Sequence, residues 1–188
     1  RYNRNVLNTR VSLGNVRVEE FVQGYNRFRV TSAEGGKSVS QVEFETPLVC
    51  ANYRTKSLFF SLPEDVLNKI PGENVFAAIL GVRNVCVELA SSIAFCSRKD
   101  VSSAMKFSND PPNSKCVIFI YDCCPNGVGL SDKLFECAEL LLEKAAYLVK
   151  NCPCERGCPL CICSGRGGGR AAGAKKFVKM MLDCMTTV

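Results

Sequence analysis

The sequence predicts an α+β fold, in which an antiparallel β-rich amino-terminal part packs with helices and a four-cysteine site lies between two carboxy-terminal helices. Three observations support this class. Apolar and polar residues alternate through residues 11–62, residues 73–96 are almost wholly apolar over a helical length, and residues 151–163 contain five cysteines. A chain of 188 residues, 47% of them hydrophobic, can bury a core of its own.

Residues 11–62 are expected to form the β-rich part. The segments "GNVRVEEFV", "NRFRVT", "SVSQVEFET" and "KSLFFSL" alternate with period two, and Gly24, "EGGKS" and Pro47 separate them. This pattern predicts an antiparallel sheet with one face in water. The "EGGKS" stretch, residues 34–38, is similar to a phosphate-binding loop, but Thr31 occupies the position of its first glycine, so we interpret it as a turn.

Residues 63–188 are expected to be mainly helical. Pro63 and Glu64 begin a short helix that Pro71 and Gly72 end. Residues 73–96 are too long for a strand and predict a buried central helix. A polar loop follows, and "CVIFIYD", residues 116–122, predicts a buried strand that "CCPNG" turns into the next element.

Two further helices flank the cysteine-rich stretch. Residues 131–150 begin with Ser131 or Asp132 as N-cap and repeat apolar residues at 134, 138, 141, 145 and 148. After the cysteines, "SGRGGGR" predicts a flexible loop. The chain then ends in a helix with one apolar face, formed by Ala174, Phe177, Val178, Met181, Leu182 and Met185.

The residue types that are absent exclude several kinds of site. The chain has no histidine and no tryptophan, so Ser-His-Asp triads, Cys-His pairs and histidine metal sites are excluded. Any metal must be held by sulfur or oxygen. Asp122 and the thiols of Cys123 and Cys124 lie at a strand end, where active sites occur, but without a histidine base we favour a tight turn into the helix.

The cysteine count favours a reducing compartment. Thirteen cysteines are an odd number, and eight are scattered among apolar neighbours, where a reduced cysteine behaves as a small hydrophobe. We therefore expect an intracellular protein, nuclear if eukaryotic and cytoplasmic if bacterial. The sequence starts at Arg1 and opens without an apolar run long enough for a signal or a membrane span. We interpret it as part of a longer soluble protein with no membrane partner.

The remaining five cysteines predict a metal site. Cys152, Cys154, Cys158 and Cys161 have the spacing C-x-C-x3-C-x2-C, in which two short chelating pairs can surround a tetrahedral Zn²⁺. Four protein ligands leave no open position, so the ion would be structural. Disulfides and an iron–sulfur cluster are the alternatives, since thiolates serve all three. Cys163 could replace one of the four ligands.

A basic stretch surrounds these cysteines. The net charge is +6, and residues 156–182 contain six basic residues and no acidic one. Such a run suits a polyanion such as nucleic acid, although basic runs are often only solvated faces. A zinc ion held by four thiolates carries a formal charge of about −2, so part of the basic charge could instead balance the metal site.

Three stretches together resemble a known family. "VIFIYDCCPNGVGLS", the helix that ends at Lys150 and "NCPCERGCPLCICSG" are similar to the carboxy-terminal MrfA zinc-binding domain of MrfA-like (Hrq-type) superfamily-two DNA helicases. "VQGYNRF" and "LGVRNVCVELASSIAFCSRKDV" fit the same layout. Asn126-Gly127 stands where the family commonly has two glycines, the central helix lacks the family's histidines, and a glycine run replaces a further cysteine.

The resemblance implies a function. The metal ligands would be Cys152, Cys154, Cys158 and Cys161, and the whole of residues 1–188 would be a single accessory domain, with a β-rich part over 1–62 and a helical part over 63–188. It would follow two RecA-like motor domains in an ATP-dependent 3′-to-5′ DNA helicase linked to the repair of crosslinked DNA. ATP and Mg²⁺ would bind only to the motor, since these residues contain no Walker A loop.

We expect three kinds of partner: DNA, the motor domains in cis and a repair nuclease. The expected phosphate contacts come from the basic stretch: Arg156, Arg166, Arg170, Lys175 and Lys176. Two rival functions stay open from the sequence. One is a structural or protein-interaction module that does not touch DNA. The other is a thiol redox protein that uses Cys123, Cys124 or the cysteines of residues 152–163.

Overall fold

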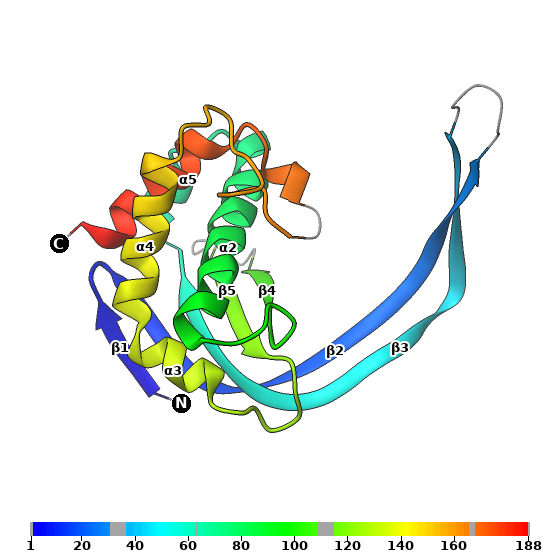
Figure 1. Ribbon diagram of the computed structural model, residues 1–188, viewed down its shortest axis with the longest axis horizontal. Coiled ribbons are helices and arrows are strands. Elements are labelled where there is room, and N and C mark those ends of the chain that lie inside the picture. The colour runs from blue at the N-terminus through cyan, green and yellow to red at the C-terminus, as the bar shows by residue number, and fades with distance from the viewer. Residues whose placement is uncertain (1, 31–36, 63, 109–114, 166–167, 188) are drawn as a thin grey trace. The chain divides into compact units, whose positions relative to one another are not determined.

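The computed structural model describes residues 2–30, 37–62, 64–108, 115–165 and 168–187. Strands and helices are mixed along the chain, which confirms the predicted α+β class (Figure 1). The elements are β1 (Tyr2–Val6), β2 (Thr9–Val30), β3 (Lys37–Ser61), α1 (Glu64–Leu67), α2 (Gly72–Ala94), β4 (Val101–Ser108), β5 (Lys115–Asp122), α3 (Leu130–Glu136), α4 (Ala138–Asn151), the 3₁₀ helix η1 (Gly168–Ala171) and α5 (Lys175–Thr186).

The chain divides into two compact units, and each is described by itself. The smaller unit, residues 17–54, consists of the adjoining parts of β2 and β3. The rings of Tyr25 and Phe44 lie 5.9 Å apart, and Arg17 Nε donates to Asn52 Oδ1 at 3.0 Å. Residues 34–36 of the predicted "EGGKS" turn lie outside the described residues.

The expected strand breaks at Gly24 and Pro47 are wrong, because both residues lie inside continuous strands. At Gly24 a Cβ atom would collide with the Val42 carbonyl oxygen, so glycine allows a close approach of two backbones and does not end the strand. At Pro47 the missing N–H is tolerated because a two-stranded ribbon leaves one edge of each strand without a partner.

The larger unit comprises residues 1–16 and 55–188. The five strands lie in the order β1-β2-β3-β5-β4, and β1–β2, β3–β5 and β4–β5 pair antiparallel. Strands β1 and β4 were not predicted from the sequence. Residues 101–108 were expected to lie in a polar loop, because their apolar residues do not alternate regularly, but pairing with β5 makes them a strand.

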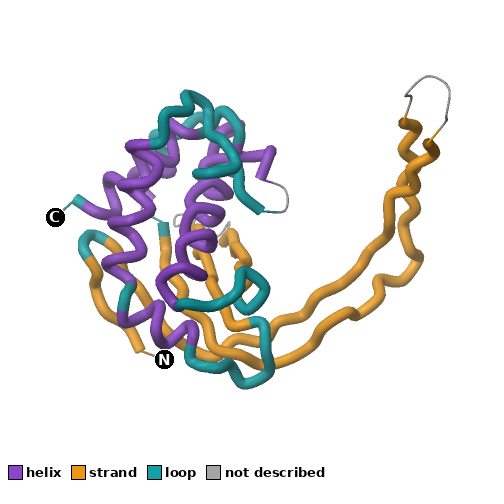
Figure 2. Tube along the Cα trace, in the orientation of Figure 1, coloured by secondary structure: helices purple, strands orange, loops and turns teal. Residues whose placement is uncertain are grey.

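The core lies between one face of this sheet and the helices. Leu58, Ile118 and Ile120 are fully buried on that face, and α2, α4 and α5 contact one another (Figure 2). Helix α2 confirms the predicted central helix. It is long and apolar enough to cross a bilayer, but 61% of its apolar window is buried inside this fold, which accounts for its composition.

The predicted helix over 131–150 is interrupted. Helix α3 ends at Glu136, Cys137 follows, and α4 begins at Ala138. The predicted N-cap is also wrong: α3 begins at Leu130, and Gly129 with φ +91° is the N-cap. The short helix after Pro63 and the last helix are confirmed, and α5 buries Val178, Met181, Leu182 and Met185.

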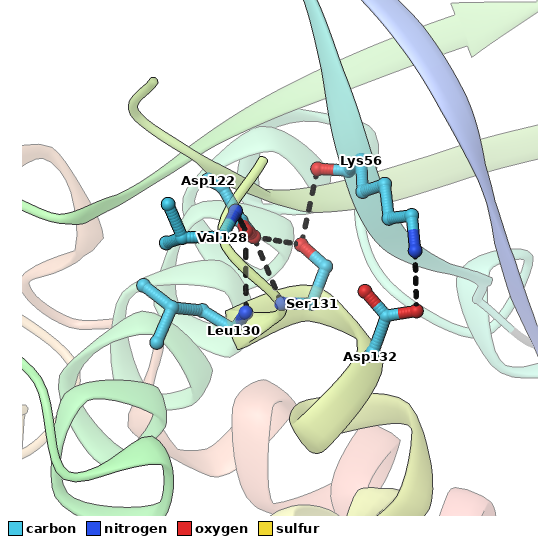
Figure 3. A network of polar contacts seen from close by, with 6 residues as sticks. All are labelled: Lys56, Asp122, Val128, Leu130, Ser131 and Asp132. Atoms are coloured by element: carbon cyan, nitrogen blue, oxygen red, sulfur yellow. Dashed lines mark hydrogen bonds and ion pairs between the residues drawn. The ribbon is translucent and has the colours of Figure 1, made fainter. Parts of the chain in front are cut away.

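Asp122, which ends β5, holds the turn into α3 (Figure 3). Its buried carboxylate accepts hydrogen bonds from the backbone N–H groups of Val128, Leu130 and Ser131 at 2.8, 3.2 and 2.8 Å. The Ser131 hydroxyl donates to the same carboxylate at 2.5 Å, so it serves the turn and does not cap the helix. This confirms the interpretation of "YDCCPNGVGLS" as a tight turn.

Candidate metal centre

Four thiols meet at the carboxy-terminal end of α4. The Sγ of Cys152 lies 3.5 Å from that of Cys154 and 3.6 Å from that of Cys158, and the Sγ of Cys161 lies 3.5 Å from that of Cys154 and 3.6 Å from that of Cys158. All four lie within 4.8 Å of one another. A tetrahedral ion with Zn–S bonds of ~2.3 Å would place its sulfurs about 3.8 Å apart, so the four residues fit Zn²⁺.

The same distances argue against the alternatives. A disulfide would bring two sulfurs to about 2.0 Å, and all thirteen cysteines carry free thiols. Sulfurs in mutual contact leave room for one small ion but not for a core of several irons and sulfides. Cys163 is outside the group of four, and its backbone N–H donates to the Cys158 carbonyl at 3.0 Å. The geometry therefore favours Cys161 over Cys163 as the fourth ligand.

The loop between the thiols depends on one glycine. Gly157 has φ +106°, and a Cβ on it would come within 2.6 Å of the Ile162 side chain. This lets the chain reverse so that the pair Cys152 and Cys154 faces the pair Cys158 and Cys161. The second pair is closed by a turn, in which the Cys158 carbonyl accepts from Cys161 N at 3.0 Å, and Cys158 N donates to Cys161 Sγ at 3.3 Å.

Helices α2 and α5 hold the cysteine loop from outside. Asn84 of α2 donates from its side-chain Nδ2 to the Ile162 carbonyl at 2.8 Å. The backbone carbonyl of Asn84 accepts from the Ser164 hydroxyl at 3.3 Å. Lys175, at the start of α5, donates from Nζ to the carbonyls of Cys152 (2.6 Å) and Cys154. Asn84 was not predicted as a site residue, because its only signal in the sequence is an amide in a long apolar helix.

Burial and neighbouring thiols set different proton affinities within the group. Burial raises the pKa of the Cys161 thiol to about 12. Burial also opposes ionisation of Cys154, but hydrogen bonds from Cys152, Cys161 and Cys158 outweigh it and lower the pKa of Cys154 to about 7. Because metal ligation requires thiolates, Cys154 is the thiol in this group most ready to supply the first one near neutral pH.

The predicted DNA contacts are placed as follows. Arg156 is exposed on the cysteine loop, Arg170 is exposed in η1, and Lys176 is exposed on α5 with its Nζ 4.7 Å from the Phe177 ring centroid. Lys175 is half-buried, and its ammonium donates hydrogen bonds to carbonyls of the cysteine loop. Arg166 lies outside the described residues.

Comparison with known proteins identifies the class of site. The model of the MrfA Zn-binding domain family matches residues 82–162, a stretch that runs from α2 through all four clustered cysteines. Residues 82–162 are therefore similar to an MrfA Zn-binding domain, and the four-cysteine cluster lies within this matched stretch as its zinc site. This confirms the family resemblance and the structural zinc.

Relatives extend the similarity beyond that domain. The chain is 27% identical over 182 residues to YprA of Bacillus subtilis, named as an uncharacterized ATP-dependent helicase, covering 95% of this chain and 22% of YprA. Over 63 residues, 34% of this chain and 56% of the relative, it is 48% identical to the uncharacterized protein MJ1572.1 of Methanocaldococcus jannaschii. The chain thus spans about a fifth of the length of one relative and about half of the other.

Solved structures share the fold. The DUF1998 helicase MrfA bound to DNA matches 97% of this chain and 23% of its own, with a TM-score of 0.62 and 23% identity. MrfA bound to DNA and AMPPNP matches 94% of this chain and 23% of its own, with a TM-score of 0.54 and 18% identity. The structural match covers the β-rich part as well as the zinc site.

Proposed function

We propose that this chain is the zinc-stabilised accessory domain of an ATP-dependent DNA helicase, where it supports DNA binding and strand separation. The observation that carries the proposal is the extent of the match: 97% of this chain, and not only its cysteine loop, follows the fold of a DNA-bound helicase. Within the described residues there is no metal-binding group besides the four thiols. The motor that consumes ATP would lie elsewhere in the parent protein.

The basic segment, defined as residues 156–179, is the proposed DNA contact. Its side chains Arg156, Arg170, Lys176 and Lys179 are exposed, and within the part of the chain that the structure describes none of them lies within 4.0 Å of an acidic group. Exposed cations without acidic partners can release the counterions of a phosphate backbone. Arg166 belongs to the same proposal on sequence grounds.

The zinc site would give this segment its shape. The Arg156 carbonyl accepts from Gly173 N at 2.7 Å, which joins the cysteine loop to the residues just before α5. Lys175 ties the start of α5 to the same loop through Cys152 and Cys154. A structural Zn²⁺, closed by four ligands, would therefore fix the arginine of the loop relative to the lysines of the helix. Lys175 itself would stabilise the cysteine loop in preference to contacting DNA phosphates.

Finer aspects of the function follow from the family resemblance. We propose 3′-to-5′ translocation by the parent helicase and a role in the repair of crosslinked DNA, with a repair nuclease as a further partner. This chain would contribute phosphate contacts and no catalytic group. Translocation polarity is tested by unwinding of partial duplexes with a 3′ or a 5′ overhang, and unwinding from the 5′ overhang alone would overturn that part.

The DNA contact is tested in the intact parent helicase. Arg156→Gln, Arg170→Gln, Lys176→Gln and Lys179→Gln are combined, and affinity for single-stranded DNA is measured across a salt series. Each lost phosphate contact should reduce the slope of log affinity against log salt by about 0.7. The matched control replaces Lys99 and Lys144, exposed lysines outside the basic segment, by glutamine. A slope unchanged from the native helicase would favour a protein-interaction module that leaves DNA to the motor.

A further inference from the structure

The sheet of the larger unit has a second face that is partly exposed around Phe59 and Phe119. Phe59 of β3 and Phe119 of β5 are directly opposite one another in the antiparallel register. Their neighbours in the same strands, Leu58 and Ile120, are also opposite one another and are fully buried. Because successive side chains point to opposite faces, the two phenylalanines lie on the face away from the core. Both are only half-buried.

The two rings form an aromatic platform. Their centroids are 5.2 Å apart with an interplanar angle of 29°, a stacked arrangement. They line a hollow of about 890 Å³ over β1, β2, β3 and β5, together with Asn3, Arg10, Asn15 and Val117. The rings therefore lie side by side on the floor of an open groove and not in a sealed core.

The polar surroundings of the platform favour a particular ligand. Arg10 and the amide side chains of Asn3 and Asn15 are exposed at the groove. Lys106 of β4 is opposite Val117 in the register, so its exposed side chain belongs to the same face. Glu64 is the one acidic residue among the described residues that line the hollow. Aromatic rings flanked by cations and amides suit planar bases joined by phosphates, whereas a protein partner would favour a drier apolar surface.

We propose that this open sheet face is a base-stacking site for single-stranded nucleic acid. Phe59 and Phe119 would stack on bases, Arg10 and Lys106 would contact the flanking phosphates, and the asparagine amides would donate to or accept from base edges. Sheets that carry aromatic residues on adjacent strands bind single strands in this way. The site is formed by β1, β2, β3, β4 and β5 and contains no residue of the basic segment, so it goes beyond the proposed function and can be tested separately.

The absence of tryptophan from the chain provides the probe. Phe119→Trp in the complete chain introduces a single indole at the platform, and its fluorescence is titrated with oligothymidylate of about 12 nucleotides, a length typical of single-strand sites. Stacking should quench the fluorescence saturably. An abasic oligomer of the same length keeps the phosphates but has no bases, and it should not quench. Oligouridylate distinguishes RNA from DNA as the preferred strand.

A matched probe controls for unspecific quenching. Phe107→Trp places the indole on β4 at a residue that is 43% exposed and stacked on Phe76, outside the groove. Its fluorescence should not change with oligothymidylate. Equal quenching of both probes, or quenching of the Phe119→Trp protein by the abasic oligomer, would overturn base stacking. No quenching at low salt would overturn the site altogether.

A second variant measures the contribution of the rings while keeping the sheet face apolar. Phe59→Leu with Phe119→Leu retains apolar side chains but removes both aromatic faces, and it should weaken oligothymidylate binding by about tenfold or more. Binding unchanged from the native chain would contradict the proposal. Combining the Phe119→Trp probe with the glutamine substitutions of the basic segment separates the two sites: persistent quenching shows that the platform binds even if the proposed phosphate contacts fail.

Discussion

The Lys175 ammonium lies 2.6 Å from the carbonyl oxygen of Cys152 and donates to it, and it also donates to the carbonyl of Cys154. Lys175, the first residue of α5, thus forms hydrogen bonds to both residues of the chelating pair that follows α4, Cys152 and Cys154. Its positive charge lies beside a site that would carry about two negative charges when zinc is bound by four thiolates. Lys175 therefore supports the zinc loop both by hydrogen bonding and by charge.

Replacing Lys175 by methionine should weaken zinc binding. The substitution keeps most of the apolar stem but removes the donor to two carbonyls, and loss of such an outer partner typically costs 10- to 100-fold in metal affinity. The measurement is zinc release to a chromogenic chelator. Lys176→Met, one residue further along and exposed, is the matched control and should release zinc as the native chain does. Equal zinc affinity of the Lys175→Met and native proteins would show that the Lys175 hydrogen bonds do not support zinc binding.

Replacing Cys158 and Cys161 together by serine should abolish zinc binding. The native chain, purified without added metal, is expected to hold about one zinc per chain by native mass spectrometry, and the double variant should hold none and be less stable. Cys163→Ser is the control. Cys163 lies outside the group of four, so the Cys163→Ser protein should retain the metal. Loss of zinc in the Cys163→Ser protein would assign the fourth ligand differently, and iron in the native chain would change the cofactor.

Gly157→Ala should destabilise the zinc loop by more than backbone strain alone. An alanine at φ +106° costs about 1–2 kcal/mol, and its Cβ would also press on the buried Ile162. Gly165→Ala separates the two effects, because Gly165 also has a positive φ, +74°, but has open space around it. Free energies of unfolding from urea titrations should rank native above Gly165→Ala above Gly157→Ala. Similar losses for both variants would leave no role for the contact with Ile162.

Thiol reactivity should follow burial and pKa. Burial raises the pKa of Cys86 and of Cys116 to about 12, from the 9.0 of a free thiol. Both stay protonated in the folded chain as pH rises from 7 through 9, so iodoacetamide should not modify them there, whereas the exposed Cys50 should react. The raised pKa also means that stability present below pH 9 is lost as pH rises towards 12, because the unfolded chain releases these protons first. Mass mapping of folded protein checks the labelling, and rapid labelling of Cys86 would contradict its burial.

Elements with a strong local pattern could be predicted from the sequence. The apolar length of α2 and the one-sided apolar face of α5 predict helices whatever the partner segments are, because a helix satisfies its own backbone hydrogen bonds. Strands β1 and β4 could not be predicted, since their short polar sequences become strands only beside β2 and β5. The same applies to Gly24, whose position inside a strand depends on the close approach of the Val42 backbone in the folded chain.

The four-cysteine cluster could be predicted from the sequence alone. Cys152, Cys154, Cys158 and Cys161 lie within ten residues, and a chelate of that size is formed by local chain geometry. The contacts that hold the loop and the surfaces that stay open depend instead on how distant segments pack. Asn84 reaches Ile162 across 78 positions of sequence, and Phe59 meets Phe119 through strand pairing. Such contacts depend on register and packing between distant segments, which no local pattern encodes.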